Sequence, residues 1–161
     1  MSFLFRQFSN GKKITDHPDN RPIVFINANF SNCDSLIQQV IPEIRVIVIS
    51  PQANGIREIS CILNSSCCRE MYIICQGSPG CLHIGNTELS LNTLIQYSLR
   101  LQSWFNDASD ASIDSPRLYL YGCNVAAGDV GEEFITKLSS ISGATIAASA
   151  RVPQDNIFNL T

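Results

Sequence analysis

Basic residues are too few and too scattered in this sequence to form a positively charged surface. The chain has 11 lysines and arginines against 14 aspartates and glutamates, which gives a formal net charge of −3. Charges of one sign gather only in short pairs such as Lys12 with Lys13. Because nucleic-acid binding needs lysines and arginines clustered on one face, we expect no nucleic-acid partner.

Long apolar runs are also missing. A secretory signal needs an apolar stretch of roughly 7 to 15 residues, and a transmembrane helix needs about 20. The first residues, MSFLFRQFSNGKK, contain an apolar group that Arg6 interrupts, and the longest runs elsewhere are strand-sized. We therefore expect no membrane insertion and no N-terminal signal peptide. The compartment is left open between the cytoplasm, as the default, and export by a C-terminal signal.

Zinc-ligand spacing and nucleotide-binding loops are absent as well. None of the seven cysteines forms a Cys-x-x-Cys pair, and the close pairs Cys67–Cys68 and Cys75–Cys81 lack matching histidine ligands. Neither a Gly-x-Gly-x-x-Gly stretch nor a Walker-type lysine loop occurs. We therefore expect no metal and no cofactor. The odd number of cysteines leaves one thiol unpaired in a monomer, which favours a reducing compartment or thiols that serve as small core residues.

What the sequence does contain is an alternation of apolar runs and amphipathic segments. The runs read as strands that are buried on both faces, because they are continuous and rich in Ile and Val: 23–26, 46–49, 71–75, 118–121 and 144–148. The segments between them have helical spacing: 31–41, 54–66, 90–105 and 129–143, the last ending at Gly143. This alternation predicts a mostly parallel α/β sheet of about five strands in three layers, with flavodoxin-like topology.

The same pattern predicts how the rest of the chain is divided. Residues 1–20 are interpreted as an N-terminal extension and residues 21–161 as one α/β domain. A turn-rich insert at 77–90 predicts a small hairpin after the third strand. Residues 107–116 have the composition of a surface loop.

Two glycine turns follow neighbouring strands of the predicted sheet. Gln76 and Gly77 come after the third strand, and Gly122 and Cys123 come after the fourth. Because the carboxyl ends of parallel strands meet at one edge, we expect these residues to face one crevice. The separation of 47 residues (123 − 76) is close to the roughly 50 that separate the catalytic histidine and cysteine of caspases. Cys123 is the candidate nucleophile.

This arrangement resembles the caspase and gingipain clan of cysteine peptidases. In that clan a His-Gly turn supplies the base and an oxyanion N–H, and a Gly-Cys turn supplies the nucleophile. The resemblance implies a three-layer caspase-like fold, with Gly77 as the candidate oxyanion N–H. It also places Gln76 where the histidine usually stands.

A closer resemblance covers residues 22 to about 150, through the stretches GSPGCLHIGNTELSL, YGCNVAAGDVGEEF and SGATIAAS. They are similar to an uncharacterised bacterial domain that commonly stands at the N-terminus of long, repeat-containing surface or adhesin-like proteins. Members usually have a His-Gly-Ser-Pro-Gly turn, whereas this chain reads QGSPG at 76–80. The resemblance implies a protein or peptide partner.

The glutamine decides between the functional hypotheses. An imidazole raises the thiolate fraction of a neighbouring cysteine and protonates the leaving group, whereas glutamine has no titratable group. His83, in the 77–90 insert, is a weak candidate base, and His17 is a loop residue. The leading hypothesis is therefore a catalytically impaired caspase-like domain that serves as a recognition or assembly module. The alternatives are a cysteine peptidase or thiol-reactive protein that uses Cys123 with an unorthodox base, and a redox-responsive thiol protein.

Overall fold

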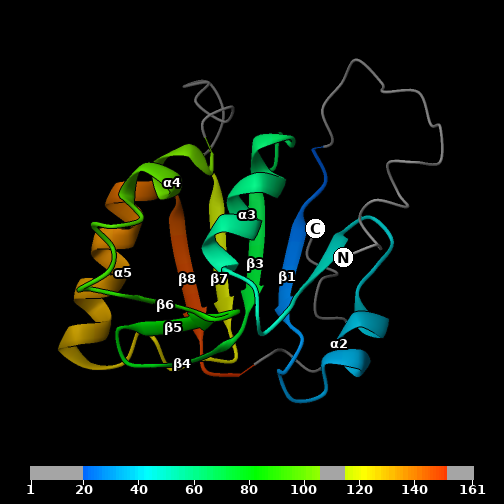
Figure 1. Cartoon of the computed structure of the whole chain (residues 1–161), viewed down its shortest axis with the longest axis horizontal. Helices are drawn as coiled ribbons and strands as arrows, with labels where there is room; N and C mark the ends of the chain where they lie inside the picture. Colours follow the sequence, from blue (N-terminus) through cyan, green and yellow to red (C-terminus); the bar gives the residue numbers. More distant parts are fainter. Residues whose placement is uncertain (1–19, 106–114, 152–161) are drawn as a thin grey trace.

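The fold is seen in a computed structural model that describes residues 20–105 and 115–151 (Figure 1). The expected N-terminal extension, except for Asn20, and most of the expected loop at 107–116 lie outside these ranges, as does His17. None of the helices within the described ranges is long and apolar enough to cross a membrane.

The centre of the described part is a parallel sheet of five strands. They run in the order β2-β1-β3-β7-β8: β1 (Ile23–Asn27), β2 (Arg45–Ile49), β3 (Glu70–Ile74), β7 (Arg117–Tyr121) and β8 (Thr145–Ser149). Each strand lies within one residue of the predicted run. Numbered within this sheet, the order is 2-1-3-4-5, which confirms the flavodoxin-like topology.

Helices cover both faces of this sheet and complete the three predicted layers. One face packs against α2 (Cys33–Gln39), and its core includes Val24, Ile26, Tyr72 and Leu36. The other face packs against three helices: α3 (Gly55–Asn64), α4 (Ser98–Ser103) and α5 (Gly128–Ser142). Helix α5 ends at Gly143, as predicted. Helix α2 connects β1 to β2 across one face of the sheet, and α3 connects β2 to β3 across the other face. The strand order therefore reverses between β1 and β3.

The prediction of a helix at 90–105 is wrong for more than half of these residues. Ser90 ends strand β6, residues 91–97 form turns, and only Ser98–Ser103 is helical. The hydroxyl of Thr93 accepts a hydrogen bond from Ser90 N–H (2.8 Å) and donates one to Glu88 O (3.0 Å), so local side-chain bonds replace a first helical turn. Ile95 and Leu99, which belong to the apolar positions on which this helix was predicted, are 82% and 80% exposed.

A second, antiparallel sheet stands where a hairpin was predicted. It has three strands: β4 (Gln76–Ser78), β5 (Cys81–Ile84) and β6 (Thr87–Ser90). Gln76 thus opens a new strand instead of closing β3. The small sheet lies at the carboxyl ends of the central strands (Figure 1). Gly80 N–H donates to Val125 O (2.8 Å) and Asn86 N–H to Ala53 O (2.7 Å), so two rim loops hold it in place.

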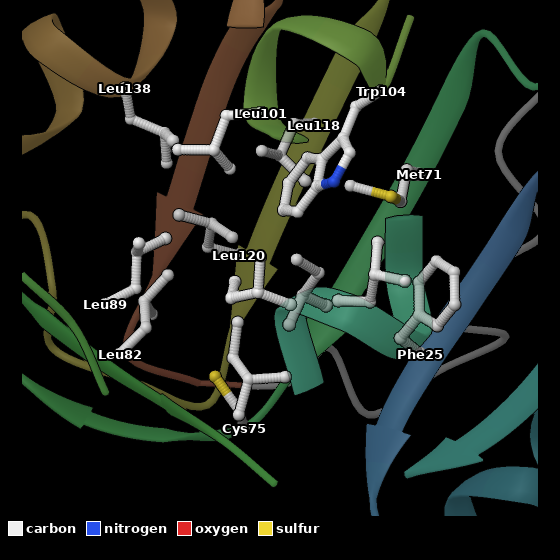
Figure 2. Packing of buried hydrophobic residues seen from close by; sticks show 14 of the residues in the cluster. Phe25, Met71, Cys75, Leu82, Leu89, Leu101, Trp104, Leu118, Leu120 and Leu138 are labelled. Carbon is white, nitrogen blue, oxygen red and sulfur yellow. The ribbon is translucent and has the colours of Figure 1, made fainter. Parts of the chain in front are cut away.

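The larger core extends from the α4 end of the sheet to this small sheet. Figure 2 shows Trp104 and Met71 at one end of the cluster, and Cys75 with Leu82 at the other. The buried indole N–H of Trp104 donates to Ser60 Oγ at 2.9 Å. Because Cys75 directly follows β3, the core extends to the edge of the sheet where the two glycine turns begin.

Candidate functional site

The two glycine turns emerge side by side, because β3 and β7 are hydrogen-bonded neighbours in parallel register. Gly122 directly follows β7 with φ +80°, and a Cβ atom there would come within 2.5 Å of the Phe30 ring. Its N–H donates to Ser149 O at 3.1 Å. Only glycine suits both this conformation and this close contact, so the turn before Cys123 is set by the backbone.

Cys123 lies beneath the small sheet and is only 3% exposed. A Cβ atom on Gly77 would stand 3.0 Å from Cys123 Cβ and 2.5 Å from Cys81 O. Strand β4 can therefore pass this close to Cys123 only with glycine at position 77. The structure brings Cys123 and Gly77 together and, in doing so, covers the thiol.

The Cys75 thiol is the hydrogen-bond partner of Cys123. Its S–H group, together with the backbone N–H groups of Val125 and Cys123, lowers the pKa of Cys123, while burial acts in the opposite direction. The pKa of Cys75 is raised well above its usual range, because its proton is held between the two sulfurs and because the side chain is buried. Cys123 is thus the more acidic thiol, and its neighbour is a proton donor.

Gln76 is directed to the other side of β3. Its Oε1 accepts from Asn27 Nδ2 at 3.0 Å, and its Nε2 donates to Asn29 O at 3.1 Å. Both partners follow or close β1, whereas Cys123 follows β7, and β3 lies between these two strands. In the part of the chain that the structure describes, no hydrogen bond joins Gln76 to Cys123.

Asn27 is a polar centre at this edge that the sequence reasoning did not single out. It is 3% exposed, and its amide also donates to His83 O (2.7 Å) and accepts from Gly85 N–H (3.1 Å). It stands where the strand order reverses between β1 and β3, the place where open α/β sheets bind ligands. Here the chain's own amides occupy that place. The sequence signal that could have identified Asn27 is a polar residue directly after the apolar run at 23–26.

His83 lies on the outer face of the small sheet. Its neighbours on β5, Leu82 and Ile84, are fully buried and belong to the same core cluster as Cys123. Because side chains alternate along a strand, the imidazole points away from that core. Its Nε2 lies 3.8 Å from Cys81 Sγ. The structure therefore places this weak candidate base with Cys81 instead of with Cys123.

A family model described as Domain of unknown function (DUF4347) matches residues 23–153. The chain belongs to this family. The match runs from the first residue of β1 to beyond β8 and includes both glycine turns. No curated protein and no solved structure matches the chain.

The chemistry open to this DUF4347 domain at the glycine turns follows from two of its seven thiols, those of Cys75 and Cys123. The sulfur of Cys123 is stabilised as an anion, which favours nucleophilic or redox reactions. Its small exposure and its position under β4 oppose them, since a substrate atom must come within about 3–3.5 Å of the attacking sulfur. Among the residues that the structure describes, the side chains whose donor atoms gather closely enough to hold a metal ion lie elsewhere, on the outer face of the small sheet: Cys81, His83 and Glu88.

Proposed function

We propose that this chain is a caspase-like α/β domain that does not hydrolyse peptides and acts as a protein-recognition or assembly module. The observation that carries the proposal is the binding of Gln76 to β1. The position that supplies a base in the peptidases it resembles holds an amide with no titratable group, and that amide is bound to Asn27 and Asn29.

The surroundings of Cys123 support the same conclusion. A general base must lie within hydrogen-bond reach of the proton that it removes. The group in that position is the Cys75 thiol, which holds its own proton because its pKa is raised. No imidazole within residues 20–105 and 115–151 contributes to the pKa of Cys123. General acid–base catalysis is worth roughly 10²–10⁴ in rate, so we expect no effective turnover.

Recognition is supported by two large aliphatic side chains that face solvent. Ile95 and Leu99 lie four residues apart between β6 and the end of α4, and water covers most of each. Burial of apolar surface of this size contributes about 1.5–3 kcal/mol per side chain, which is enough to favour an apolar partner. A peptide or protein with complementary apolar residues fits this segment.

One peptide library tests both halves of the proposal. We expect no Cys123-dependent hydrolysis of the library, with Cys123→Ala as the control. When the same library is displayed and selected for binding, we expect selected peptides to lose affinity for an Ile95→Asp/Leu99→Asp variant. Val48→Asp, which alters an exposed apolar residue on strand β2, serves as the matched control. Hydrolysis that disappears in Cys123→Ala overturns the proposal, as does a selection that yields no binder.

A thiol-reactive or redox-responsive protein is the second candidate, favoured by the lowered pKa of Cys123 and its contact with Cys75. The rate of Cys123 alkylation against pH discriminates, because an inflection at the pKa of a free thiol excludes an activated cysteine. Intact mass after mild hydrogen peroxide, with and without reductant, tests the redox form. A Cys75–Cys123 disulfide removes two hydrogen atoms, and reductant restores them.

A further inference from the structure

Three metal-binding side chains converge on the outer face of the small sheet. Cys81 and His83 occupy alternate positions of β5, and Glu88 stands directly opposite His83 on β6. Their donor atoms all lie within 4.8 Å of one another, and Cys81 Sγ lies 3.8 Å from His83 Nε2. Strand alternation and cross-strand pairing bring the three together, because both place side chains on one face.

The separations suit a single small cation. In tetrahedral zinc sites the Zn–S distance is about 2.3 Å and the Zn–N distance about 2.0–2.1 Å, which puts the two ligand atoms about 3.5 Å apart. The Cys81–His83 separation is only slightly longer, so a small side-chain rotation completes the geometry. Hydrogen bonding to both β4 and β6 holds β5 in place, so the ligands project from fixed backbone.

The donor set selects the class of metal. A thiolate, an imidazole and a carboxylate together suit Zn²⁺, whereas Ca²⁺ and Mg²⁺ require oxygen ligands. His83 and Glu88 are exposed and Cys81 is half-buried, so a hydrated ion can reach all three. Burial, and then the nearby Glu88 carboxylate, raise the pKa of the Cys81 thiol. A cation bound between these groups replaces their repulsion with coordination.

We propose that Cys81, His83 and Glu88 form a Zn²⁺ site on the outer face of the small sheet, with a water molecule in the fourth coordination position. The site is independent of Cys123, which follows β7 and lies beneath the opposite, inner face of that sheet. Bound zinc would link β5 to β6 and stabilise the sheet that covers the Cys123 turn. The sequence analysis did not single out these three residues, because it looked for ligand pairs with Cys-x-x-Cys spacing. In the proposed site, Cys81 and His83 form a Cys-x-His pair on β5, and Glu88 on β6 supplies the third ligand.

Cobalt titration of the reduced 1–161 chain tests the site directly. We expect about one equivalent of Co²⁺ to produce the visible bands of a tetrahedral ion and a thiolate-to-cobalt charge-transfer band, both abolished by added Zn²⁺. Each of Cys81→Ser, His83→Gln and Glu88→Gln should weaken binding by about tenfold or more. Cys81→Ser should also remove the charge-transfer band. Cys61→Ser, which removes an exposed thiol on α3, is the matched control and should bind as the unmodified chain does.

Two further measurements distinguish metal binding at this site from metal binding by other thiols and from the unfolding of a variant. Cys123→Ala should retain the cobalt spectrum; loss of the spectrum in that variant would place the metal at the Cys75–Cys123 pair and overturn the proposal. Zn²⁺ should raise the Tm of the unmodified chain, since it binds the folded state, and should leave the Tm of the triple ligand variant unchanged. A charge-transfer band that persists in Cys81→Ser, or no band in the unmodified chain, also overturns it. Far-UV circular dichroism confirms that each variant is folded.

Discussion

Asn27 explains why the glutamine at position 76 is held so firmly. The Asn27 side chain has lost nearly all contact with water, yet both its oxygen and its nitrogen are hydrogen-bonded. One of those partners is the Gln76 amide, which offers a donor and an acceptor on the same flexible side chain. Gln76 is thus a structural link between β1 and β4.

Asn27→Ala is expected to lower the free energy of unfolding by about 2–3 kcal/mol, because Gly85 N–H and His83 O lose their partner inside the protein. Gln76→Ala should cost about 1 kcal/mol, since its side chain is half-buried and water can replace it. Urea unfolding measures both. Asn29→Ala is the matched control, because that exposed side chain lies outside the network and only its backbone carbonyl takes part. Equal losses for Asn27→Ala and Asn29→Ala would contradict the account.

Cys68 gives the chain a sensitivity to alkaline pH. This thiol is 3% exposed and donates to Glu70 O at 2.9 Å, and its burial raises its pKa from 9.0 to about 11. Between these values the unfolded chain has lost the proton and the folded chain has kept it. The unfolded state then binds fewer protons, so stability falls as the pH rises.

We expect this thiol to lower the free energy of unfolding by about 1.4 kcal/mol for each pH unit between about 9 and 11. Urea unfolding at several pH values in this window measures the slope. Tyr72 and Tyr121 also have raised pKa values because they are buried, and they steepen the slope in the same direction. Cys68→Ala keeps both tyrosines, so the difference between the two slopes isolates the thiol. Parallel slopes would refute the assignment.

One buried hydrogen bond links α3 to the end of α4. Ser60 Oγ accepts from the Trp104 indole at 2.9 Å and donates to Ile56 O at 2.7 Å. Ser60→Ala should therefore cost about 1–3 kcal/mol in the free energy of unfolding, because the indole N–H loses its partner. In a Trp104→Phe background, which has no such N–H, the same change should cost at least about 1 kcal/mol less. Additive losses in this double-mutant cycle would show that the bond contributes nothing.

Strands and helices differ in how far the sequence predicted them. The five central strands were placed to within one residue, because each is a continuous apolar run that favours a strand. The expected burial on both faces holds for β1 and for nearly all of β3, whereas the edge strands β2 and β8 are only partly buried. The helix predicted at 90–105 had the right apolar spacing, but period alone does not reveal that Thr93 bonds to the neighbouring backbone. Leu94 and Leu101 are buried from a turn and a short helix instead.

The sequence predicted only part of the candidate site, because topology determines where strands end but not the direction of every side chain beyond them. Gly77 and Cys123 meet because parallel neighbours end at one edge, which topology alone determines. The direction of Gln76 was not accessible in the same way. The chain leaves β3 at Cys75 and begins a new strand at once, so the side-chain alternation depends on the small sheet. Only the register of β4 with β5 reveals that position 76 faces outward with His83.

The small sheet covers the part of the carboxyl edge where the two glycine turns lie, and hydrogen bonds to several parts of the central domain hold it there. Its turns bind the loop after β2 through Ala53 and the loop after β7 through Val125, and Asn27 binds it from β1. Three of the five central strands thus contribute contacts to one cover. The core beneath this cover includes Cys75 and Cys123. Access to either thiol therefore requires the cover to move, whatever residue stands at position 76.

Gln76→His tests whether the fold lacks only a base. We expect no peptide hydrolysis above the rate of the Gln76→His/Cys123→Ala control, because the side chain at 76 projects toward β1, and a base must lie about 2.6–3.2 Å from the atom that it deprotonates. The thiol itself is 3% exposed. Cleavage of the peptide library, followed by mass spectrometry, measures the outcome. Turnover that depends on both the introduced imidazole and Cys123 would mean that the imidazole can turn toward β7 and that the cover opens, so the domain would be a peptidase scaffold one substitution from activity.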